Sequence, residues 1–263
     1  MKLQGALALV TGGSRGIGKA VAQQLIQCGV EVAIVARGEI ELKQVATDIG
    51  ATPITADLTD PTAVDHIVAE AIAALGRVDL LVNNAALVRP TAVTAMADAD
   101  LQGEMQCNLL APMRLVHRLL PAMIERRYGH IVNVSSGAAA LPLSNMSNYC
   151  ASKAGLLHYS ASLRAEISHV GIGVTVAELG TVAGTRAYYD ALEDPQMRKL
   201  YGRLQRVGLM TDTTPEEVAA KIATAVQRRK PYVRVPRAAG LGWALNSLVR
   251  DTTYYLFRSK AAG

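Results

Sequence analysis

Three residues in the middle of the chain have the types and the spacing of an acid–base group. Tyr149 and Lys153 are four residues apart, and Ser136 precedes Tyr149 by thirteen residues. Side chains at positions i and i+4 share one face of a helix, so a Lys ammonium would lie beside a phenol whose pKa in water is about 10. A nearby positive charge lowers the pKa of a phenol. The pair therefore predicts a side chain that exchanges a proton near neutral pH, with a serine hydroxyl to hold the reacting oxygen.

A glycine-rich turn near the N-terminus lies between a predicted strand and a predicted helix. The apolar run 6–11 is typical of a strand buried on both faces of a parallel sheet, and an amphipathic helix pattern runs from about Ile17 to Cys28. The turn between them has glycines at positions 12, 13, 16 and 18. Backbone N–H groups and the helix dipole attract an anion at such a helix start. The turn predicts a dinucleotide site, against the alternative of a tight turn without a ligand.

The second predicted strand, from Glu31 to Val35, decides between two forms of the dinucleotide. NAD usually meets an acidic residue near the end of this strand, whereas an arginine accommodates the 2′-phosphate of NADP. The chain has Arg37 there, and Arg15 in the glycine turn could reach the same phosphate. We therefore predict NADP(H) rather than NAD(H). Glu39 and Glu41 lie close by and could instead pair with Arg37 as a solvated loop residue.

Further short segments complete a pattern that covers most of the chain. Asp57-Leu58 follows the third predicted strand, Asn83-Asn84-Ala85-Ala86 follows the fourth, and the apolar run Ile131–Ser136 ends in a serine. With the glycine turn and the Tyr149–Lys153 pair, the pattern resembles the short-chain dehydrogenase/reductase family in its single-domain form. The resemblance extends over roughly Leu7 to Thr185.

The resemblance implies a complete catalytic tetrad and a nicotinamide cofactor site. The tetrad would be Asn108, Ser136, Tyr149 and Lys153. The cofactor would contact Tyr149, Lys153 and residues of five other segments, namely Gly12, Ser14, Arg15, Gly16, Ile17, Gly18, Arg37, Asp57, Leu58, Asn84, Ala85, Gly180 and Val182.

The resemblance also implies a role for each tetrad residue in hydride transfer between a nicotinamide and a carbonyl or alcohol carbon. In reduction, Tyr149 would donate the proton and Ser136 would hydrogen-bond the reacting oxygen. Lys153 would lower the pKa of Tyr149 and bind the nicotinamide ribose. Asn108 would kink its helix locally and hold a water that connects Lys153 to solvent.

Two positions depart from the family pattern. Ala86 replaces the usual glycine, and the segment Leu179–Thr185 lacks a proline and places its threonine one residue late. Gly180 and Val182 are still expected to meet the carboxamide of the cofactor. Because the tetrad is intact, we expect an active enzyme rather than a regulator that only binds nucleotide.

The alternation of strand and helix patterns predicts an α/β fold, a Rossmann-like doubly wound parallel sheet of about seven strands flanked by helices. Long helices are expected near 99–126 and 149–169. We assign residues 1–236 to one catalytic domain, with a substrate lid at 185–209 and a C-terminal extension at 237–263. The expected strands lie near 6–11, 31–36, 53–56, 78–83, 130–135, 173–179 and 232–235.

Apolar residues around the predicted cleft indicate a hydrophobic carbonyl substrate, such as an acyl, lipid-like or steroid-like ketone or aldehyde. Leu141, Leu143 and Met146 precede the catalytic tyrosine, and the lid has helically spaced Tyr188, Tyr189, Leu192, Met197, Leu200, Tyr201 and Leu204. These residues could instead form lid core or subunit contacts. We predict an NADPH-dependent reductase, reversible in direction. The alternatives are an NAD-dependent alcohol dehydrogenase and a 3-oxoacyl thioester reductase.

The distribution of charge along the chain limits the kinds of partner that can be expected. The net charge is +5, but residues 228–263 contain eight Lys or Arg and one Asp. This basic tail, which includes Trp243, Tyr254, Tyr255 and Phe257, could cover the cleft, contact a membrane surface through 237–260, or be a plain surface tail. Nucleic-acid binding is not expected, because no recognition motif accompanies the charge.

Three scattered cysteines and five scattered histidines indicate neither disulfides nor a metal site. No run of about 20 apolar residues is present to span a bilayer, so we expect a cytoplasmic protein. The family resemblance further implies a homodimer or homotetramer.

Overall fold

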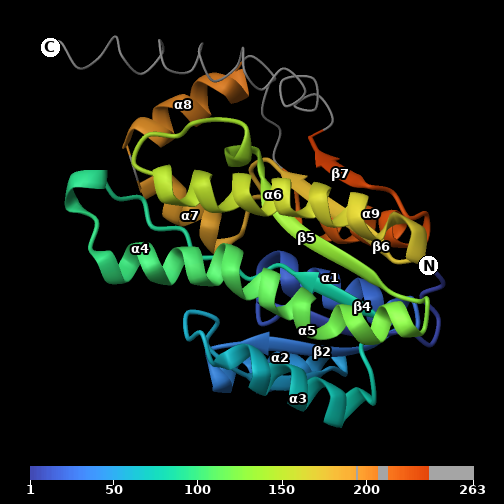
Figure 1. The fold of residues 1–263 in the computed structure, drawn as a ribbon. Coiled ribbons are helices and arrows are strands. Elements are labelled where there is room, and N and C mark those ends of the chain that lie inside the picture. Colours follow the sequence, from blue (N-terminus) through green and yellow to red (C-terminus); the bar gives the residue numbers. More distant parts are fainter. Residues whose placement is uncertain (194, 207–212, 237–263) are drawn as a thin grey trace, which may run out of the picture.

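A seven-stranded parallel sheet forms the centre of the molecule in the computed structural model, which describes residues 1–193, 195–206 and 213–236 (Figure 1). The strand order is β3-β2-β1-β4-β5-β6-β7, and helices cover both faces. The predicted doubly wound α/β fold is therefore confirmed. The strands are β1 (Leu7–Thr11), β2 (Glu31–Ala36), β3 (Thr52–Thr55), β4 (Leu80–Asn83), β5 (His130–Ser136), β6 (Gly173–Leu179) and β7 (Tyr232–Val235).

The two long helices that the sequence predicts are both present, but the first is interrupted. It consists of α4 (Asp98–Met105), the π-helical turn η2 (Gln106–Leu110) and α5 (Ala111–Glu125). The second is α6 (Ser147–Ile167). The remaining α-helices are α1 (Gly16–Gln27), α2 (Glu39–Ile49), α3 (Ala63–Leu75), α7 (Arg186–Glu193), α8 (Pro195–Arg206) and α9 (Pro215–Gln227).

Short 3-10 turns η1 (Val93–Ala95), η3 (Gly137–Ala139) and η4 (Ser168–Val170) complete the described elements. None of the described helices combines the length and the apolar character needed to cross a bilayer. The predicted lid contains α7 and α8, and the predicted basic extension 237–263 lies outside the described residues.

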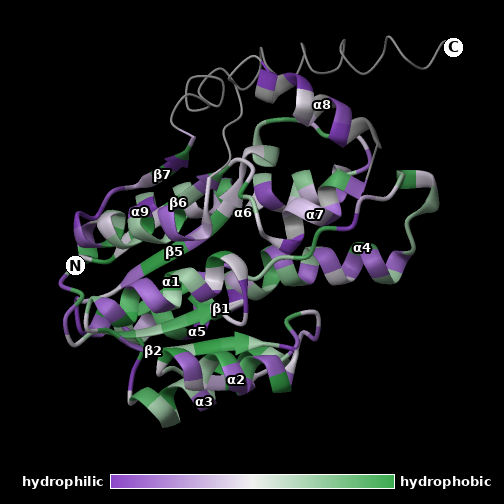
Figure 2. Ribbon diagram, turned by 180° about the vertical axis from the view of Figure 1, so that it is seen from behind, coloured by the Kyte–Doolittle hydropathy of each residue, from purple (hydrophilic) through white to green (hydrophobic). Residues whose placement is uncertain are grey.

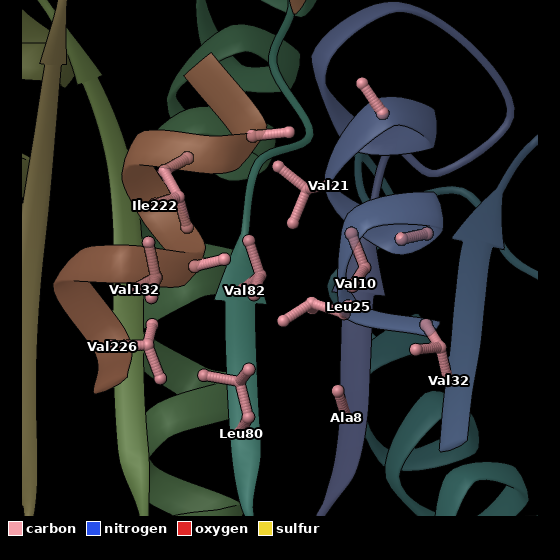
Figure 3. Packing of buried hydrophobic residues seen from close by; sticks show 14 of the residues in the cluster. Ala8, Val10, Val21, Leu25, Val32, Leu80, Val82, Val132, Ile222 and Val226 are labelled. Atoms are coloured by element: carbon pink, nitrogen blue, oxygen red, sulfur yellow. The ribbon is translucent and has the colours of Figure 1, made fainter. Parts of the chain in front are cut away.

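Hydrophobic side chains form one core layer on each face of the sheet. Successive strand residues point to opposite faces, so Val10 packs under α1 and α9 whereas Leu9 packs on the other face. Figure 3 shows the first layer, where Val21 and Leu25 of α1 and Ile222 of α9 lie over the strands. Figure 2 shows the central strands β1, β2 and β5 mostly in the hydrophobic colour and the covering helices in mixed colours. The helices therefore bury one face each and leave the other to solvent.

The strand order reverses beside β1, which pairs with β2 on one side and with β4 on the other. In open α/β sheets the ligand crevice lies at the carboxyl ends of the strands at such a point. Thr11, the last residue of β1, joins the two strand ends here. Its Oγ1 accepts hydrogen bonds of 3.0 Å from the backbone N–H groups of both Asn84 and Ala85, which follow β4.

Candidate active site

The four tetrad residues predicted from the sequence come from three elements that meet at one end of the sheet. Ser136 is the last residue of β5, Tyr149 and Lys153 lie in the first two turns of α6, and Asn108 lies in η2. The Ser136 hydroxyl faces the Tyr149 phenol closely enough to lower its pKa, and Ser136 Oγ accepts a 3.2 Å hydrogen bond from the N–H of Ala138. Ser135 Oγ donates a 3.0 Å hydrogen bond to the carbonyl of Lys153, which fixes β5 against α6.

A buried polar ladder sets the position of α6 against the sheet. Asn83 Nδ2 donates to Asn133 Oδ1 at 2.8 Å, and Asn133 Nδ2 donates to Ser160 Oγ at 2.8 Å. Each of these residues is at most 1% exposed. Buried polar groups are costly unless they are bonded, so this chain of side chains from β4 through β5 to α6 favours one register of the helix. That register places Tyr149 and Lys153 over the end of β5.

The Lys153 ammonium is held inside the protein. The residue is 2% exposed, its Nζ donates a 2.9 Å hydrogen bond to the carbonyl of Val134, and the same atom lies 5.8 Å from the centre of the Tyr149 ring. Burial lowers the pKa of Lys153 to about 8, an effect that Cys107 and Glu104 partly offset. The predicted shared helix face of Tyr149 and Lys153 is therefore present, with the amine beneath the ring.

The pKa of Tyr149 moves in the direction opposite to the one predicted. Burial raises it to about 12, and the hydrogen bond with Ser136 lowers it in part. Desolvation disfavours the charged phenolate. Sequence spacing gave the shared face correctly, but it carried no information on how deeply the phenol is buried. With its pKa raised in this way, Tyr149 is suited to donate a proton at neutral pH.

Asn108 lies in the π-helical turn and makes three hydrogen bonds to two neighbours. Its Oδ1 accepts from the backbone N–H of Leu87 at 2.8 Å, and its Nδ2 donates to the carbonyl of Leu87 at 2.9 Å and to Ser152 Oγ at 3.2 Å. Ser152 in turn donates to the carbonyl of Tyr149 at 2.8 Å. Asn108 thus lies in a π-helical interruption of its helix, a feature often found at functional sites.

Glu104 and Asn148 also belong to the site, although sequence reasoning did not identify them. Glu104 is 1% exposed, and Asn148 Nδ2 donates a 2.7 Å hydrogen bond to its Oε2. Glu104 Oε1 has no hydrogen-bond partner among the described residues. One sequence signal could have identified Glu104. It precedes Asn108 by four residues, a spacing that places two side chains on the same face of a helix.

The predicted cofactor turn is built around close backbone approaches. Gly12 and Gly16 have φ values of 68° and 53°, which favour glycine. A Cβ on Gly18 would lie 2.1 Å from the carbonyl oxygen of Gly12 and 2.5 Å from Asn84 Nδ2. The amide of Asn84 already donates to the carbonyls of Thr11 and Gly12, at 3.0 and 3.3 Å. Asn84 therefore braces the turn against the end of β4.

The start of α1 presents backbone donors to a ligand. Arg15 is its N-cap, with extended backbone, and within the described part of the chain no side chain caps the helix. The first N–H groups of a helix lack intrahelical partners and carry partial positive charge. A pyrophosphate group fits this uncapped end and the glycine cradle beside it. Ser14 is buried in the same turn, and Ile17 packs partly against the core beneath it.

Arg37 and Asp57 form an ion pair across the ends of β2 and β3. Arg37 Nη1 lies 3.6 Å from Asp57 Oδ2, and the two side chains are 53% and 43% exposed. The acidic neighbours considered from the sequence have other contacts, since Glu39 pairs with Lys43 and Glu41 accepts from Ser14. The neighbouring residue Leu58 is buried beneath this edge. Arg37 and Asp57 are thus close enough to contact the same ligand.

The segment after β6 approaches the glycine turn. The N–H of Gly180 bonds to the carbonyl of Val235 at 2.6 Å, and Val182 is buried. Thr185 Oγ1 donates to the carbonyl of Val182 at 2.8 Å, and Thr185 Cγ2 would lie 3.5 Å from a Cβ on Gly16. The threonine that comes one residue late in the sequence therefore still lies over the cofactor turn.

Aromatic side chains hold the described part of the predicted lid together. The ring of Tyr188 lies edge-on to those of Tyr189 and Tyr201, with centroids 5.3 and 5.8 Å apart. Tyr201 is buried and Tyr189 is exposed. The side chains of Met197, Leu200 and Leu204, and residues 207–209 of the predicted lid, lie outside the described part. Tyr188 and Tyr201 therefore contact each other within the lid, in agreement with the alternative that some of these residues form its core.

The three cysteines of the chain are unpaired in the structure. Cys28, Cys107 and Cys150 are free thiols, and burial raises the pKa of Cys107 to about 11. No group of three or more His, Cys, Asp or Glu residues that could hold a metal ion is found in the described residues.

Comparison with known proteins gives the same family from sequence and from structure. A family model for "short chain dehydrogenase" matches residues 6–195. The 3-oxoacyl-[acyl-carrier-protein] reductase FabG of Salmonella typhimurium is 31% identical over 241 residues, covering 89% of this chain and 94% of that protein. Nodulation protein G of Rhizobium sp. (strain N33) is 34% identical, covering 88% of this chain and 94% of that protein.

Two solved structures extend the likeness to the fold. A short-chain dehydrogenase from Streptomyces avermitilis has a TM-score of 0.80 at 30% identity, covering all of both chains. A metagenomic short-chain oxidoreductase in complex with NADP has a TM-score of 0.73 at 29% identity, covering 89% of this chain and 98% of that chain. The chain belongs to the short-chain dehydrogenase/reductase family, oxidoreductases that act on CH–OH and C=O groups.

Proposed function

We propose that the protein is an NADPH-dependent reductase that converts a hydrophobic ketone or aldehyde to an alcohol, in a reversible reaction. The observation that carries the proposal is the geometry around Lys153, whose buried amine lies 5.8 Å from the centre of the Tyr149 ring, with the Ser136 hydroxyl at the end of β5 beside the phenol. Such a pair supplies a proton and an oxygen-binding hydroxyl at one point. The NADP complex of the metagenomic relative supports the choice of cofactor.

The cofactor would be held along the carboxyl ends of β1, β2, β4 and β6. The pyrophosphate would lie at the start of α1, the 2′-phosphate at Ser14, Arg15 and Arg37, and the carboxamide at Gly180 and Val182. When bound, NADPH supplies a hydride. Lys153, which is within reach of the Tyr149 ring, would bind the ribose hydroxyls.

The chain's own residues would then handle the oxygen and the proton. Tyr149 would donate its phenolic proton to the carbonyl oxygen, and its high pKa keeps that proton available across the neutral range. Ser136 would donate a hydrogen bond to the developing alkoxide, an interaction worth about 3 kcal/mol at comparable sites. The Lys153 ammonium would stabilise the phenolate that remains after the transfer.

A ketone panel with NADPH absorbance as the readout tests this function, with two tyrosine variants on the same helix. Tyr149→Phe removes only the hydroxyl of the proposed acid, and turnover should fall by at least about 100-fold. Tyr159→Phe removes the hydroxyl of a half-buried tyrosine that packs in the core, and turnover should stay within about twofold of wild type. Turnover that survives in Tyr149→Phe, or a panel without any substrate, would count against the proposal.

A 3-oxoacyl thioester is the second candidate substrate, and the FabG relatives favour it. The apolar residues Leu141, Leu143 and Met146 between β5 and Tyr149 suit an acyl chain as well as a plain ketone. Comparing kcat/KM for an acetoacetyl thioester and for a ketone of matched length separates the two. An advantage of tenfold or more for the thioester would favour the second candidate.

We also propose that the protein forms a homo-oligomer. Leu101 and Leu110, on the helix formed by α4, η2 and α5, are exposed large apolar side chains, 44% and 41% exposed. Burying them against a second copy would remove apolar area from water. Sedimentation velocity of the wild type and of Leu110→Glu measures this, and a monomeric wild type would contradict it.

A further inference from the structure

A carboxylate contacts the glycine turn at the place proposed for the 2′-phosphate. Ser14 Oγ donates a 3.3 Å hydrogen bond to Oε2 of Glu41, which lies in the first turn of α2. A Cβ on Gly38 would lie 3.9 Å from the same oxygen. The carboxylate therefore faces the loop between β2 and α2 and reaches across to the β1–α1 turn.

The neighbouring cation has a carboxylate of its own. Arg37 is paired with Asp57 at 3.6 Å, so two carboxylates engage two of the groups assigned to the phosphate. The contacts differ in kind. Asp57 also accepts hydrogen bonds from the backbone and hydroxyl of Thr59, both at 2.9 Å, and is held in place by them. Glu41 is an exposed helix residue whose carboxylate contacts the buried Ser14 hydroxyl.

We propose that Glu41 is a specificity-determining residue that weakens binding of a 2′-phosphorylated cofactor, so that the chain discriminates only modestly between NADPH and NADH. The inference rests on the proposed function, which places the phosphate at Ser14. The Glu41 carboxylate accepts from the hydroxyl that a phosphate oxygen needs, and it repels the phosphate because both are anions. A cofactor with a free 2′-hydroxyl meets no such repulsion. Specificity is a difference of two affinities, and a repulsive group changes that difference directly.

Replacing Glu41 by Gln tests the proposal with Glu39→Gln as a matched control. Both residues lie in the first turn of α2, and both changes remove one negative charge. Glu39 bonds instead to Lys43 at 2.6 Å, on its own helix. The readout is the dissociation constant of NADPH and of NADH, measured by fluorescence titration without substrate. Glu41→Gln should bind NADPH about tenfold more tightly, and its affinity for NADH should stay within about twofold.

The control decides whether the effect belongs to Glu41. Glu39→Gln should leave both constants within about twofold of wild type. Equal tightening of NADPH binding in both variants would overturn the proposal, because general charge would then explain it. So would a gain below about threefold in Glu41→Gln, or equal gains for NADPH and NADH.

The outcome is separable from the fate of the proposed function. A wild type that binds NADH more tightly than NADPH would refute the proposed cofactor preference. The change in NADPH affinity between wild type and Glu41→Gln would still decide the role of Glu41. The double variant Ser14→Ala with Glu41→Gln adds a cycle, in which the effect of Glu41→Gln should shrink once the hydroxyl is absent. If the effects of the two substitutions on the free energy of NADPH binding simply add, Glu41 does not act through the Ser14 hydroxyl.

Discussion

Asn148 donates a 2.7 Å hydrogen bond from Nδ2 to Oε2 of Glu104, which links the residue directly before Tyr149 to the helix that carries Asn108. Burial raises the pKa of the Glu104 carboxyl, and the bond from Asn148 lowers it in part. The backbone of Arg89 also favours the charged form. Two sides of the active site are therefore joined through an acid whose ionisation the protein disfavours.

Removing the charge of Glu104 should make stability less dependent on pH. The native pKa lies above the ordinary value of 4.5, so the native state binds more protons than the unfolded state once the pH exceeds 4.5. The free energy of unfolding of wild type should therefore fall, relative to that of Glu104→Gln, as the pH rises from 4.5. Urea unfolding at pH 4.5, 6 and 7.5 measures the difference. A constant difference would mean that the carboxyl titrates alike in both states.

A second variant separates charge from hydrogen bonding at the same position. Glu104→Leu lacks the oxygen that accepts from Asn148, so the half-buried amide of Asn148 keeps only its 3.3 Å bond to the carbonyl of Leu101. It should be less stable than Glu104→Gln at every pH by about 1 kcal/mol, the typical net contribution of one hydrogen bond. Equal stability of the two variants would show that the hydrogen bond contributes little.

Contacts such as Glu104–Asn148 show where prediction from the sequence ends. All seven strands could be located, because apolar runs bounded by turn residues are typical of a buried parallel sheet. The partner of Glu104 lies 44 residues away along the chain, and only the packing of α4 against α6 brings the two together. A local pattern does not contain that information.

The Arg37–Asp57 ion pair could have been predicted in part, unlike the Glu104–Asn148 contact. The sequence placed both residues directly after neighbouring strands, and β2 and β3 pair in parallel. Ends of adjacent parallel strands lie side by side, so the pairing could have been inferred once the strand order was known. From the sequence, Glu39 and Glu41 were the partners considered for Arg37, because they are close to it along the chain.

Replacing Arg37 by Asp should reverse the cofactor preference proposed for the chain. The change removes a cation assigned to the 2′-phosphate and sets a carboxylate near Asp57 and near that phosphate. The ratio of NADH to NADPH dissociation constants should fall by at least about tenfold. Fluorescence titration of both cofactors gives the ratio, with Lys221→Asp at an exposed position of α9 as the charge control. An unchanged ratio would contradict the placement of the phosphate.

The pH profile of carbonyl reduction should report Lys153. Below its pKa of about 8 the amine is charged and stabilises the phenolate that forms as Tyr149 gives up its proton. Above that pH the neutral amine no longer does so, and kcat/KM for reduction should decline. Tyr149 itself keeps its proton well beyond this range, since its pKa is about 12. A profile flat from pH 6 to 10 would contradict this assignment.

Lys153→Met should trade activity for stability. The native pKa of about 8 lies below the ordinary 10.5, so burying the charged amine costs stability in full below pH 8. The variant should gain about 2 kcal/mol at pH 7 while turnover is lost. Between pH 8 and 10.5 wild type recovers, because the unfolded state there binds more protons, and the difference should shrink. Guanidinium unfolding at pH 7 and 10 checks the sign, and a less stable variant at pH 7 would refute it.

Gly18→Ala should disrupt the cofactor turn, whereas Gly38→Ala should not. A Cβ on Gly18 meets the carbonyl oxygen of Gly12 at 2.1 Å, and both belong to the rigid turn that Asn84 braces. We expect a loss of roughly 3 kcal/mol in the free energy of unfolding and weaker NADPH binding. Gly38 is the N-cap of α2, where a Cβ has only an ordinary contact at 3.9 Å, so its cost should stay below about 1 kcal/mol. Thermal unfolding with and without NADPH measures both effects, because a ligand that binds only the native state raises the melting temperature. Equal losses in the two variants would show that the close approach at Gly18 relaxes without cost, and that the turn is less rigid than its backbone contacts indicate.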